Sequence, residues 1–343
     1  PGRVLAAATI VSAAGALFFN LMPTILALAA NQFRLSDDQL GGVGSSYLGG
    51  FAVVATTSNL WVDRLNWRVL IAIASLLSTL GLTGAAFATS LPTLLASLGL
   101  AGACLGTLYT VCIAVVSENH KPDQAFGVKL TGEVGLAIIG LLALSVFALA
   151  QADFQVAISI LAGLSGIAAL SGLIAFPAGR AILPPEKRFA MKRRAGGDVR
   201  APRNLTSWLG LTALFVSFSG LSALWAYVSQ LAPTFGLGSN GTQSVLTAAL
   251  VCSGAAGMTA ALLGDKFGRV KPLTIGMILA ICGVAALSLG RDANLYLVGV
   301  VLTGGLWNFP MAYQMGMIAS SDERGNVAVL MPAALAIGGA MGP

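Results

Sequence analysis

Charged residues are scarce in this chain. Asp, Glu, Lys and Arg make up 9% of its 343 residues, against about 25% in a typical soluble domain. A surface with so few charges cannot face water on all sides, which excludes a soluble enzyme, a disordered chain and a nucleic-acid-binding protein. Histidine occurs once, and the four cysteines form no CxxC pair. We therefore expect no metal site, no cofactor and no disulfide framework.

Apolar residues make up 56% of the sequence and fall in long, continuous runs. Runs of about 20 residues can cross roughly 30 Å of hydrocarbon as α-helices. They do not alternate between apolar and polar residues, which excludes a membrane β-barrel. The sequence therefore predicts an all-α membrane protein with eleven spans, at 4–30, 39–60, 69–88, 91–116, 125–150, 155–178, 204–231, 242–263, 272–290, 293–319 and 326–343.

The positive charge is divided unevenly between the two sets of connecting loops. Sixteen Lys and Arg residues fall on one side of the predicted spans, whereas Arg34 and Arg291 alone fall on the other. An excess of Lys and Arg marks the cytoplasmic side of a membrane protein. Orientation thus explains the net charge of +6. We expect a cytoplasmic N-terminus and a lipid bilayer as the partner, with no nucleic acid.

A long basic segment separates two halves of the chain. Residues 179–203 carry eight Lys and Arg residues together with Pro and Gly, which is typical of a cytoplasmic linker. It divides an N-terminal bundle, 1–178, from a C-terminal bundle, 204–343. The last apolar run is still open at Pro343. We therefore expect two bundles of six spans, with the twelfth span absent from this sequence.

The two halves repeat each other. Asp63 and Asp265 follow equivalent spans at an offset of 202 residues, and each precedes a basic residue. The acidic loop at 121–127 recurs at 321–326. Internal repeats of this kind are typical of secondary transporters.

The loops after the second and eighth predicted spans carry a family motif. The second copy is Gly264-Asp265-Lys266-Phe267-Gly268-Arg269-Val270-Lys271. The first copy, Asn59-Leu-Trp-Val-Asp63-Arg64-Leu-Asn66-Trp-Arg68, keeps the acid and the bases but replaces both glycines. With the repeat and the topology, the chain resembles bacterial members of the major facilitator superfamily. The resemblance implies two pseudosymmetric six-helix bundles around a central cavity, in a monomer of the inner membrane.

The resemblance also implies roles for two sets of residues. The loop motif would hold the cytoplasmic side shut by pairing with helix ends of the other bundle, although ordinary exposed ion pairing is the alternative. This gate comprises Asp63, Arg64, Arg68, Asp265, Lys266 and Arg269. The first, fourth, seventh and tenth spans line the cavity in that family, and their polar side chains either contact substrate or bond neighbouring helices. The candidate contacts are Asn20, Thr24, Tyr109, Trp225, Tyr227, Trp307, Asn308, Tyr313 and Gln314.

Glu133 is the one acid predicted near the middle of the membrane. It lies about nine residues into the fifth span, which at 1.5 Å per residue is roughly 13 Å deep. Lys129 lies one turn away on the same helix face and can pair with it. Charges inside a bilayer are expensive and by default functional. Glu133 is therefore expected either to load and release a proton during transport or to form a structural pair with Lys129.

Together these features predict a secondary active transporter, not an enzyme. It would move a small organic solute by alternating access, coupled to protons. An organic anion would suit Lys129, whereas an amphipathic or aromatic compound would suit the Trp and Tyr residues. The alternatives are a proton-independent facilitator, a drug-type efflux antiporter and, remotely, a membrane-embedded enzyme built on Lys129 and Glu133.

Overall fold

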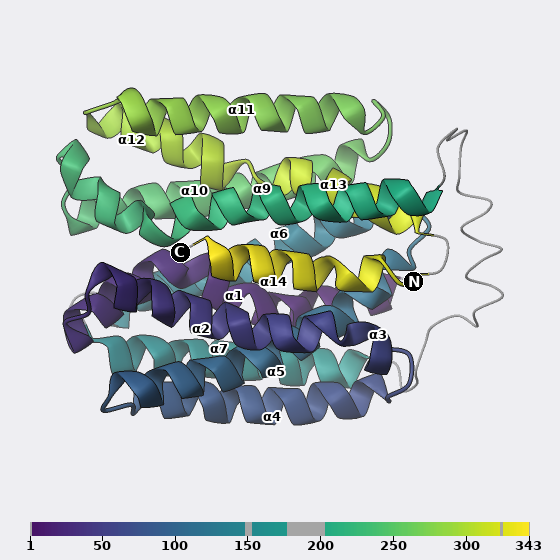
Figure 1. The fold of residues 1–343 in the computed structure, drawn as a ribbon, viewed down its shortest axis with the longest axis horizontal. Coiled ribbons are helices and arrows are strands. Elements are labelled where there is room, and N and C mark those ends of the chain that lie inside the picture. Colours follow the sequence, from purple (N-terminus) through teal and green to yellow (C-terminus); the bar gives the residue numbers. More distant parts are fainter. Residues whose placement is uncertain (1, 148–152, 177–202, 323–324, 343) are drawn as a thin grey trace.

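The computed structural model describes residues 2–147, 153–176, 203–322 and 325–342. These residues are mostly helical, and Figure 1 shows the long helices running side by side. The predicted linker, 179–203, lies outside the described residues except at Arg203, where a helix begins. We call the end of the molecule at which residues 176 and 203 lie the linker end.

Seven helices form the first half of the chain. Polar caps at their starts accept the free backbone N–H groups of the first turn. Ser36 and Ser90 form capping boxes, and Asn66 and Asp153 cap through their side-chain oxygens. The helices are α1 (Gly2–Phe33), α2 (Asp37–Thr56), the short α3 (Ser58–Trp61), α4 (Trp67–Ala86), α5 (Leu91–Ser117), α6 (Pro122–Phe147) and α7 (Phe154–Ala175).

The second half contains a broken helix at the tenth predicted span. Its first part ends in a π-helical turn, η2, at Val301–Gly305, and its second part begins at Asn308. Such turns interrupt the regular hydrogen bonding of a helix and occur frequently at functional sites. The elements of this half are α9 (Arg203–Leu231), η1 (Ala232–Phe235), α10 (Ser239–Leu263), α11 (Val270–Leu289), α12 (Ala293–Val300), η2, α13 (Asn308–Ser321), η3 (Ala328–Leu330) and α14 (Met331–Met341).

Within the described residues, nine helical segments are long and apolar enough to cross a membrane. The second and eleventh predicted spans are the exceptions. The second is α2, a 20-residue helix rich in Gly and Ser, and the eleventh is α14, with 11 residues. The all-helical membrane fold expected from the sequence is confirmed, and the chain is a multi-pass membrane protein.

The helices pack as two bundles that meet along equivalent elements. Helices α1, α2, α4, α5, α6 and α7 contact one another in the first bundle, and α9 to α14 form the second. Between the bundles, α6 packs along α10 and α2 packs along α14. These two pairs are related by the internal repeat, because α2 corresponds to α10 and α6 to α14. The helices that begin the two halves, α1 and α9, also contact each other.

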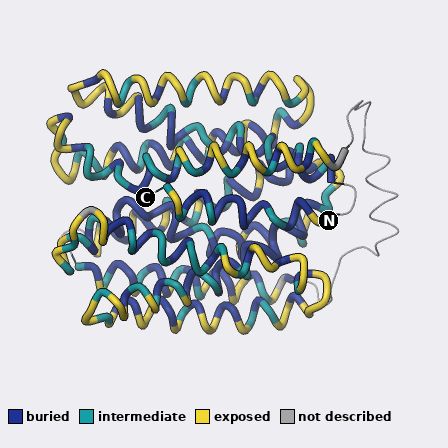
Figure 2. Tube along the Cα trace, in the orientation of Figure 1, coloured by how far each residue is buried: buried dark blue, intermediate teal, exposed yellow. Residues whose placement is uncertain are grey.

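Burial increases from the outer helices towards the bundle interface. Figure 2 shows mostly buried residues along α1 and many exposed residues along α4 and α11. Large apolar side chains are exposed on these outer helices, such as Leu76 at 64% and Ile281 at 66%. Exposed apolar surface of this extent is expected where the surrounding solvent is lipid.

Glycine allows α2 and α5 to approach closely. A Cβ atom on Gly50 would lie 2.0 Å from the carbonyl oxygen of Gly99, and one on Gly102 would lie 1.9 Å from that of Tyr47. Small residues at such positions let membrane helices pack backbone to backbone. Gly49, next to Gly50, has no atom within 4 Å of its Cβ position. Gly50 and Gly102 therefore set this helix spacing together with Gly106, whose Cβ atom would lie 3.0 Å from the Cα of Phe51.

Candidate substrate cavity and charge pair

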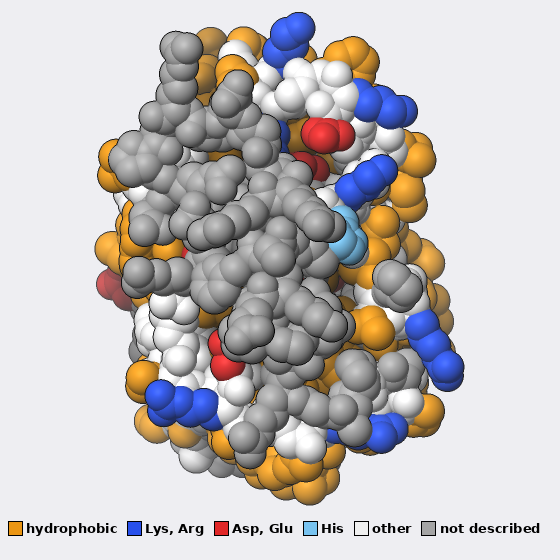
Figure 3. Space-filling model, turned by 90° about the vertical axis from the view of Figure 1, so that its right-hand side faces the viewer, with side chains coloured by type: hydrophobic (Ala, Val, Ile, Leu, Met, Phe, Trp, Pro, Cys, Tyr) orange, Lys and Arg blue, Asp and Glu red, His pale blue; other side chains and the backbone are white. Residues whose placement is uncertain are grey.

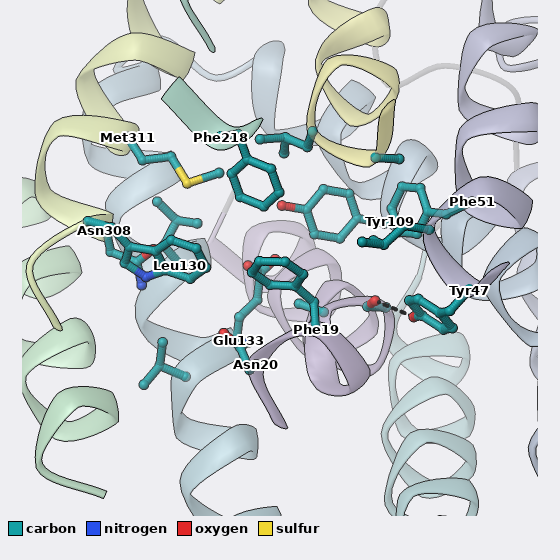
Figure 4. Close-up of a pocket in the computed structure, with 17 residues that line it drawn as sticks. Phe19, Asn20, Tyr47, Phe51, Tyr109, Leu130, Glu133, Phe218, Asn308 and Met311 are labelled. Atoms are coloured by element: carbon teal, nitrogen blue, oxygen red, sulfur yellow. Dashed lines mark hydrogen bonds between the residues drawn. The ribbon is translucent and has the colours of Figure 1, made fainter. Parts of the chain in front are cut away.

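A cavity lies between the two bundles (Figure 4). Its walls come from α1, α2, α5 and α6 of the first bundle and from α9, α13 and α14 of the second. Most of the lining side chains are apolar. Six bring polar groups to the wall: Asn20, Tyr47, Tyr109, Glu133, Trp307 and Asn308. Because both bundles contribute, any rocking of one bundle against the other changes the cavity.

Three aromatic rings from both bundles lie against one another at this cavity. The ring of Phe19 lies 5.0 Å from Phe218 and 5.4 Å from Trp307, and Phe218 lies 5.8 Å from Trp307, measured between centroids. Trp225 stands behind them, where its Nε1 donates a hydrogen bond of 3.2 Å to the carbonyl oxygen of Phe19. Rings at these separations attract one another and offer flat apolar faces to a bound molecule.

Lys129 and Glu133 form a buried ion pair on α6. The Lys129 ammonium and the Ser12 hydroxyl both donate to Glu133 Oε1. Lys129 is 0% exposed, and its Nζ lies 3.8 Å from the centre of the Tyr109 ring, a cation–π contact. Glu133 lines the cavity, whereas Lys129 does not. The carboxylate therefore faces the cavity, with the ammonium enclosed behind it.

Ser253 on α10 organises the opposite wall. Its hydroxyl oxygen accepts hydrogen bonds of 2.8 Å from Trp307 Nε1 and from Asn308 Nδ2. Both donors sit where α13 begins, directly after the π-helical turn. Their nitrogen atoms are thus directed towards α10, and the oxygen of the Asn308 carboxamide has no donor among the described residues. The carboxamide of Asn20 likewise makes no hydrogen bond within the described part of the chain.

The structure gathers some of the predicted contact residues and separates others. Asn20, Tyr109, Trp307 and Asn308 line the cavity together with Glu133. Gln314 lies at a second cavity, formed by α9, α11, η2 and α13. The remaining candidates lie away from the central cavity: Thr24, Trp225, Tyr227 and Tyr313. Their proposed contact with substrate stays a prediction without support from this geometry.

Several residues at the cavity carried no signal in the sequence. Phe19, Phe51 and Phe218 supply much of the lining, and Ser12 holds the carboxylate. A membrane helix is apolar on all sides, so its periodicity does not distinguish lipid-facing from cavity-facing aromatic residues. Phe19 could have been found through its neighbour Asn20, because a polar residue indicates which side of a membrane helix faces protein.

At the linker end, an ion pair joins the two bundles. Arg269, at the start of α11, donates from Nε to Asp123 Oδ1 at 2.9 Å and from Nη2 to Oδ2 at 2.8 Å. Its Nη1 donates to Ser320 on α13 at 2.6 Å. Two parallel bonds to one carboxylate are the strong form of this interaction. We call Asp123, Arg269 and Ser320 the latch. Asp123 was not among the predicted gate residues, although its loop belonged to the observed repeat.

The other predicted gate residues are not part of the latch. Asp63, Arg64, Asp265 and Lys266 have exposed side chains. Arg68 Nη2 lies 3.5 Å from the carbonyl oxygen of Ile174, within its own bundle. Figure 3 shows Lys and Arg side chains distributed around the rim of this face. Gate function for these residues stays a prediction.

The two copies of the loop motif differ in structure. At the repeat offset, the first copy has Trp67 where the second has Arg269. Trp67 is 1% exposed, and its Nε1 donates to Val62 within the same loop. Gly268 adopts a φ of +68°, which favours glycine, whereas the equivalent Asn66 has a φ of −74°. Trp67 therefore cannot make the contact that Arg269 makes at the equivalent position.

Two helical bundles that meet at a shared cavity are the architecture of a membrane transporter fold. The sequence matches the family model for the Major Facilitator Superfamily over residues 5–343. The chain belongs to this superfamily, as the sequence motifs predicted. No curated protein matches the sequence.

Solved structures of this superfamily share the fold at low sequence identity. The human organic anion transporter MFSD10 (TETRAN) superposes with a TM-score of 0.75 and 15% identity, over 100% of this chain and 92% of that one. The proton:xylose symporter XylE, bound to 6-bromo-6-deoxy-D-glucose, gives 0.66 and 16%, over 98% and 87%. The transporter FucP in the outward conformation gives 0.66 and 19%, over 98% and 89%.

Proposed function

We propose that this protein is a secondary active transporter that couples the movement of a small organic solute to protons. The observation that carries the proposal is the position of Glu133. Its carboxylate faces the cavity between the bundles and is held by Lys129 and Ser12. An acid at such a place can exchange a proton with whichever side of the membrane the cavity faces.

Protonation of Glu133 changes the contacts that hold α6 against α1. The neutral acid no longer balances the charge of Lys129, which is 0% exposed. A buried ammonium without its partner is costly. The proton therefore acts on the packing of two helices as well as on the cavity. This coupling between proton binding and helix packing is what a proton-driven change of conformation requires.

The latch stabilises the closed state of the cavity at the linker end. Asp123 and Arg269 must separate for solute to pass between α6 and α11 at that end. Hydrogen bonds to charged groups contribute about 1.5–3 kcal/mol each, so the latch favours closure without preventing opening. Alternation between closure at this end and closure at the opposite end is the transport cycle that we propose.

We place the protein in a bacterial inner membrane with its N-terminus in the cytoplasm, as a monomer. The excess of basic residues at the linker end supports this orientation. Those that the structure describes there are Arg3, Arg64, Arg68, Lys121, Arg203, Lys266, Arg269 and Lys271. Its partners are a small-molecule solute, protons and lipid, with no nucleic acid. The proton:xylose symporter XylE has a similar fold, which supports the proposal of proton coupling.

Proteoliposomes containing a trapped pH dye provide the test. The complete protein is challenged with pooled organic acids, sugars, amino acids and drugs. We expect solute-triggered proton flux in the wild type and its loss in Glu133→Gln, with solute counterflow retained. Asp153→Asn is the matched control, because Asp153 caps α7 away from the cavity and Asn caps equally well.

Proton-independent transport would contradict the coupling mechanism. If the wild type moves a solute downhill without proton movement, the protein is a facilitator. Lys129 and Glu133 would then be a structural pair, as the alternative interpretation of the sequence holds.

A further inference from the structure

We propose that the preferred solute is an aromatic organic cation, and that its ammonium group takes the place of one proton at the Lys129–Glu133 pair. This inference rests on the proposed function, because it names the solute class for the same cavity. Two observations support it. The Glu133 carboxylate, and not the Lys129 ammonium, lines the cavity, and aromatic rings surround the carboxylate.

The cavity offers acceptors and no cation. Both donors to Glu133 contact Oε1, so Oε2 has no partner among the described residues. The carboxamide oxygen of Asn308 and the whole carboxamide of Asn20 are likewise available to a ligand. None of the described residues that line the cavity is Lys or Arg. A solute ammonium therefore finds hydrogen-bond acceptors here, one of them charged.

The same arrangement disfavours binding of an anionic solute. The nearest cation, Lys129, is enclosed behind Glu133 and covered by the ring of Tyr109. A solute carboxylate would meet the Glu133 carboxylate first, and like charges repel in a medium of low dielectric constant. Of the two solute classes that the sequence left open, the geometry thus favours an aromatic compound over an organic anion.

The aromatic rings provide the second half of the recognition. Phe19, Phe218 and Trp307 pack against one another as one aromatic cluster at the cavity wall. Phe51 and Tyr109 stand edge to face, 5.5 Å apart between centroids, on the first bundle. In Figure 4 the Tyr109 hydroxyl points towards Phe218, across the cavity. Rings at such positions stack on an aromatic solute and attract a cation through their faces.

Binding of the cation must keep the charge of the buried site balanced. With Lys129 charged and Glu133 ionised, the pair has no net charge, so an added ammonium would leave one uncompensated positive charge in a buried site. Neutrality is kept if Lys129 gives one proton to water and the solute ammonium pairs with Glu133. Lys129 then becomes a neutral amine, and no other bond forms or breaks. One cation enters the cavity for each proton that leaves.

Among the described residues, the surroundings of the pair contain no other charge that can take this role. The side chains that lie near it are the Ser12 hydroxyl from α1 and the phenol of Tyr109 and the thiol of Cys112 from α5. The Asn308 carboxamide from α13 lines the same cavity. The sequences of α7 and α10, which also pack against α6, contain no charged residue. The released proton is therefore assigned to Lys129 and Glu133 alone.

Binding of three matched probes tests the inference on the complete protein in lipid nanodiscs. The probes are naphthylmethylammonium, naphthoate and naphthylmethanol, which share one ring system and differ in charge. Titration calorimetry in two buffers of different ionisation enthalpy gives the number of protons exchanged. We expect the ammonium probe to release about one proton and its affinity to rise about tenfold for each unit of pH. The other two probes should bind at least about tenfold more weakly.

Two variants separate recognition from folding. Glu133→Gln should abolish binding of the ammonium probe while naphthylmethanol still binds. Because this change leaves Lys129 buried without its partner, the double variant E133Q/K129M is prepared as well, and its naphthylmethanol binding reports an intact cavity. Asp153→Asn should bind all three probes as the wild type does.

Three outcomes would overturn the inference: tightest binding of naphthoate with proton uptake, binding of the ammonium probe without proton release, and no binding of that probe at any pH. These outcomes differ from failure of the proposed function. Proton flux triggered by an anionic solute and lost in Glu133→Gln would leave proton coupling intact and refute only the cation. Absence of any solute-driven proton flux would refute the coupling.

Discussion

Lys129 and Glu133 stand one helical turn apart on α6, yet only the carboxylate of Glu133 reaches the cavity wall. The ammonium of Lys129 is enclosed by that carboxylate and by the ring of Tyr109. The two charges are therefore not interchangeable. Glu133 can contact water or solute directly. Lys129 is affected only through protonation of Glu133 or through solute binding to Glu133.

This arrangement predicts strong energetic coupling between the two positions. Lys129→Met should lower the free energy of unfolding by about 3–5 kcal/mol, because it leaves a buried carboxylate uncompensated. The double variant K129M/E133Q should recover most of that loss, since a buried pair replaced by neutral groups is often close to neutral in stability. Unfolding followed by tryptophan fluorescence in detergent measures both effects.

Lys121→Met is the control for that cycle, because Lys121 is exposed at the linker end. It should change the stability by less than about 0.5 kcal/mol. If the double variant were as unstable as the sum of the single variants, the ion pair would contribute no coupling. The proposed effect of Glu133 protonation on α6 packing would then be wrong.

The sequence predicted the helices and the charge pair because both depend on local pattern. Long apolar runs determine membrane helices, and residues four apart on one helix face each other. The contents of the cavity wall depend instead on which helices become neighbours. Asp123 and Arg269 are separated by 146 positions, so no local spacing indicates their contact. Similarly, the cavity includes Tyr109 but excludes Tyr313, although both are aromatic residues of predicted cavity-lining spans.

The latch predicts that Asp123→Asn shifts the protein towards opening at the linker end. The variant keeps the shape of the side chain but loses its charge, and with it about 1.5–3 kcal/mol of interaction with Arg269. The open population should increase roughly 10- to 100-fold relative to the closed one. Spin labels at Lys121 and Lys271, exposed residues on opposite bundles, report the change as longer distances in pulsed electron resonance.

Asp265→Asn provides the comparison for the latch variant. Asp265 belongs to the same loop motif as Arg269 and is exposed. Asp265→Asn should therefore leave the distances between the two spin labels nearly as they are in the wild type. Equal shifts from Asp123→Asn and Asp265→Asn would indicate a general effect of negative charge at this end. That result would remove the specific role of the latch.

Adjacent glycines on α2 should respond in opposite ways to alanine. Gly50→Ala places a Cβ atom 2.0 Å from the carbonyl oxygen of Gly99, and overpacking of this kind typically costs about 1–3 kcal/mol. Gly49→Ala meets no atom within 4 Å and should stabilise the helix slightly, because alanine is the better helix former. Thermal unfolding midpoints in the same detergent compare the two variants. Similar midpoints would show that α2 and α5 pack less closely than described.

The cavity wall formed by α13 should depend on one hydroxyl of α10. Ser253→Ala removes the hydroxyl acceptor shared by Trp307 Nε1 and Asn308 Nδ2. Asn308 Nδ2 keeps only the bond of 3.4 Å to the Ser253 carbonyl oxygen, and a donor left unpaired costs about 1–3 kcal/mol. We expect both side chains to reorient and the transport KM for a cavity-bound solute to rise at least about tenfold. Trp307→Phe keeps the ring contacts with Phe19 and Phe218 but loses one donor, so its KM should rise less.

Thr259→Ala distinguishes this effect from a general weakening of α10. The Thr259 hydroxyl is exposed and donates only to Ala255 of its own helix, at 2.8 Å. Its removal should leave KM unchanged. If Ser253→Ala behaved like Thr259→Ala, the orientation of Trp307 and Asn308 would not depend on Ser253. The rigidity of this wall would then have to come from the aromatic contacts, and Trp307→Phe, which preserves them, would be expected to transport as the wild type does.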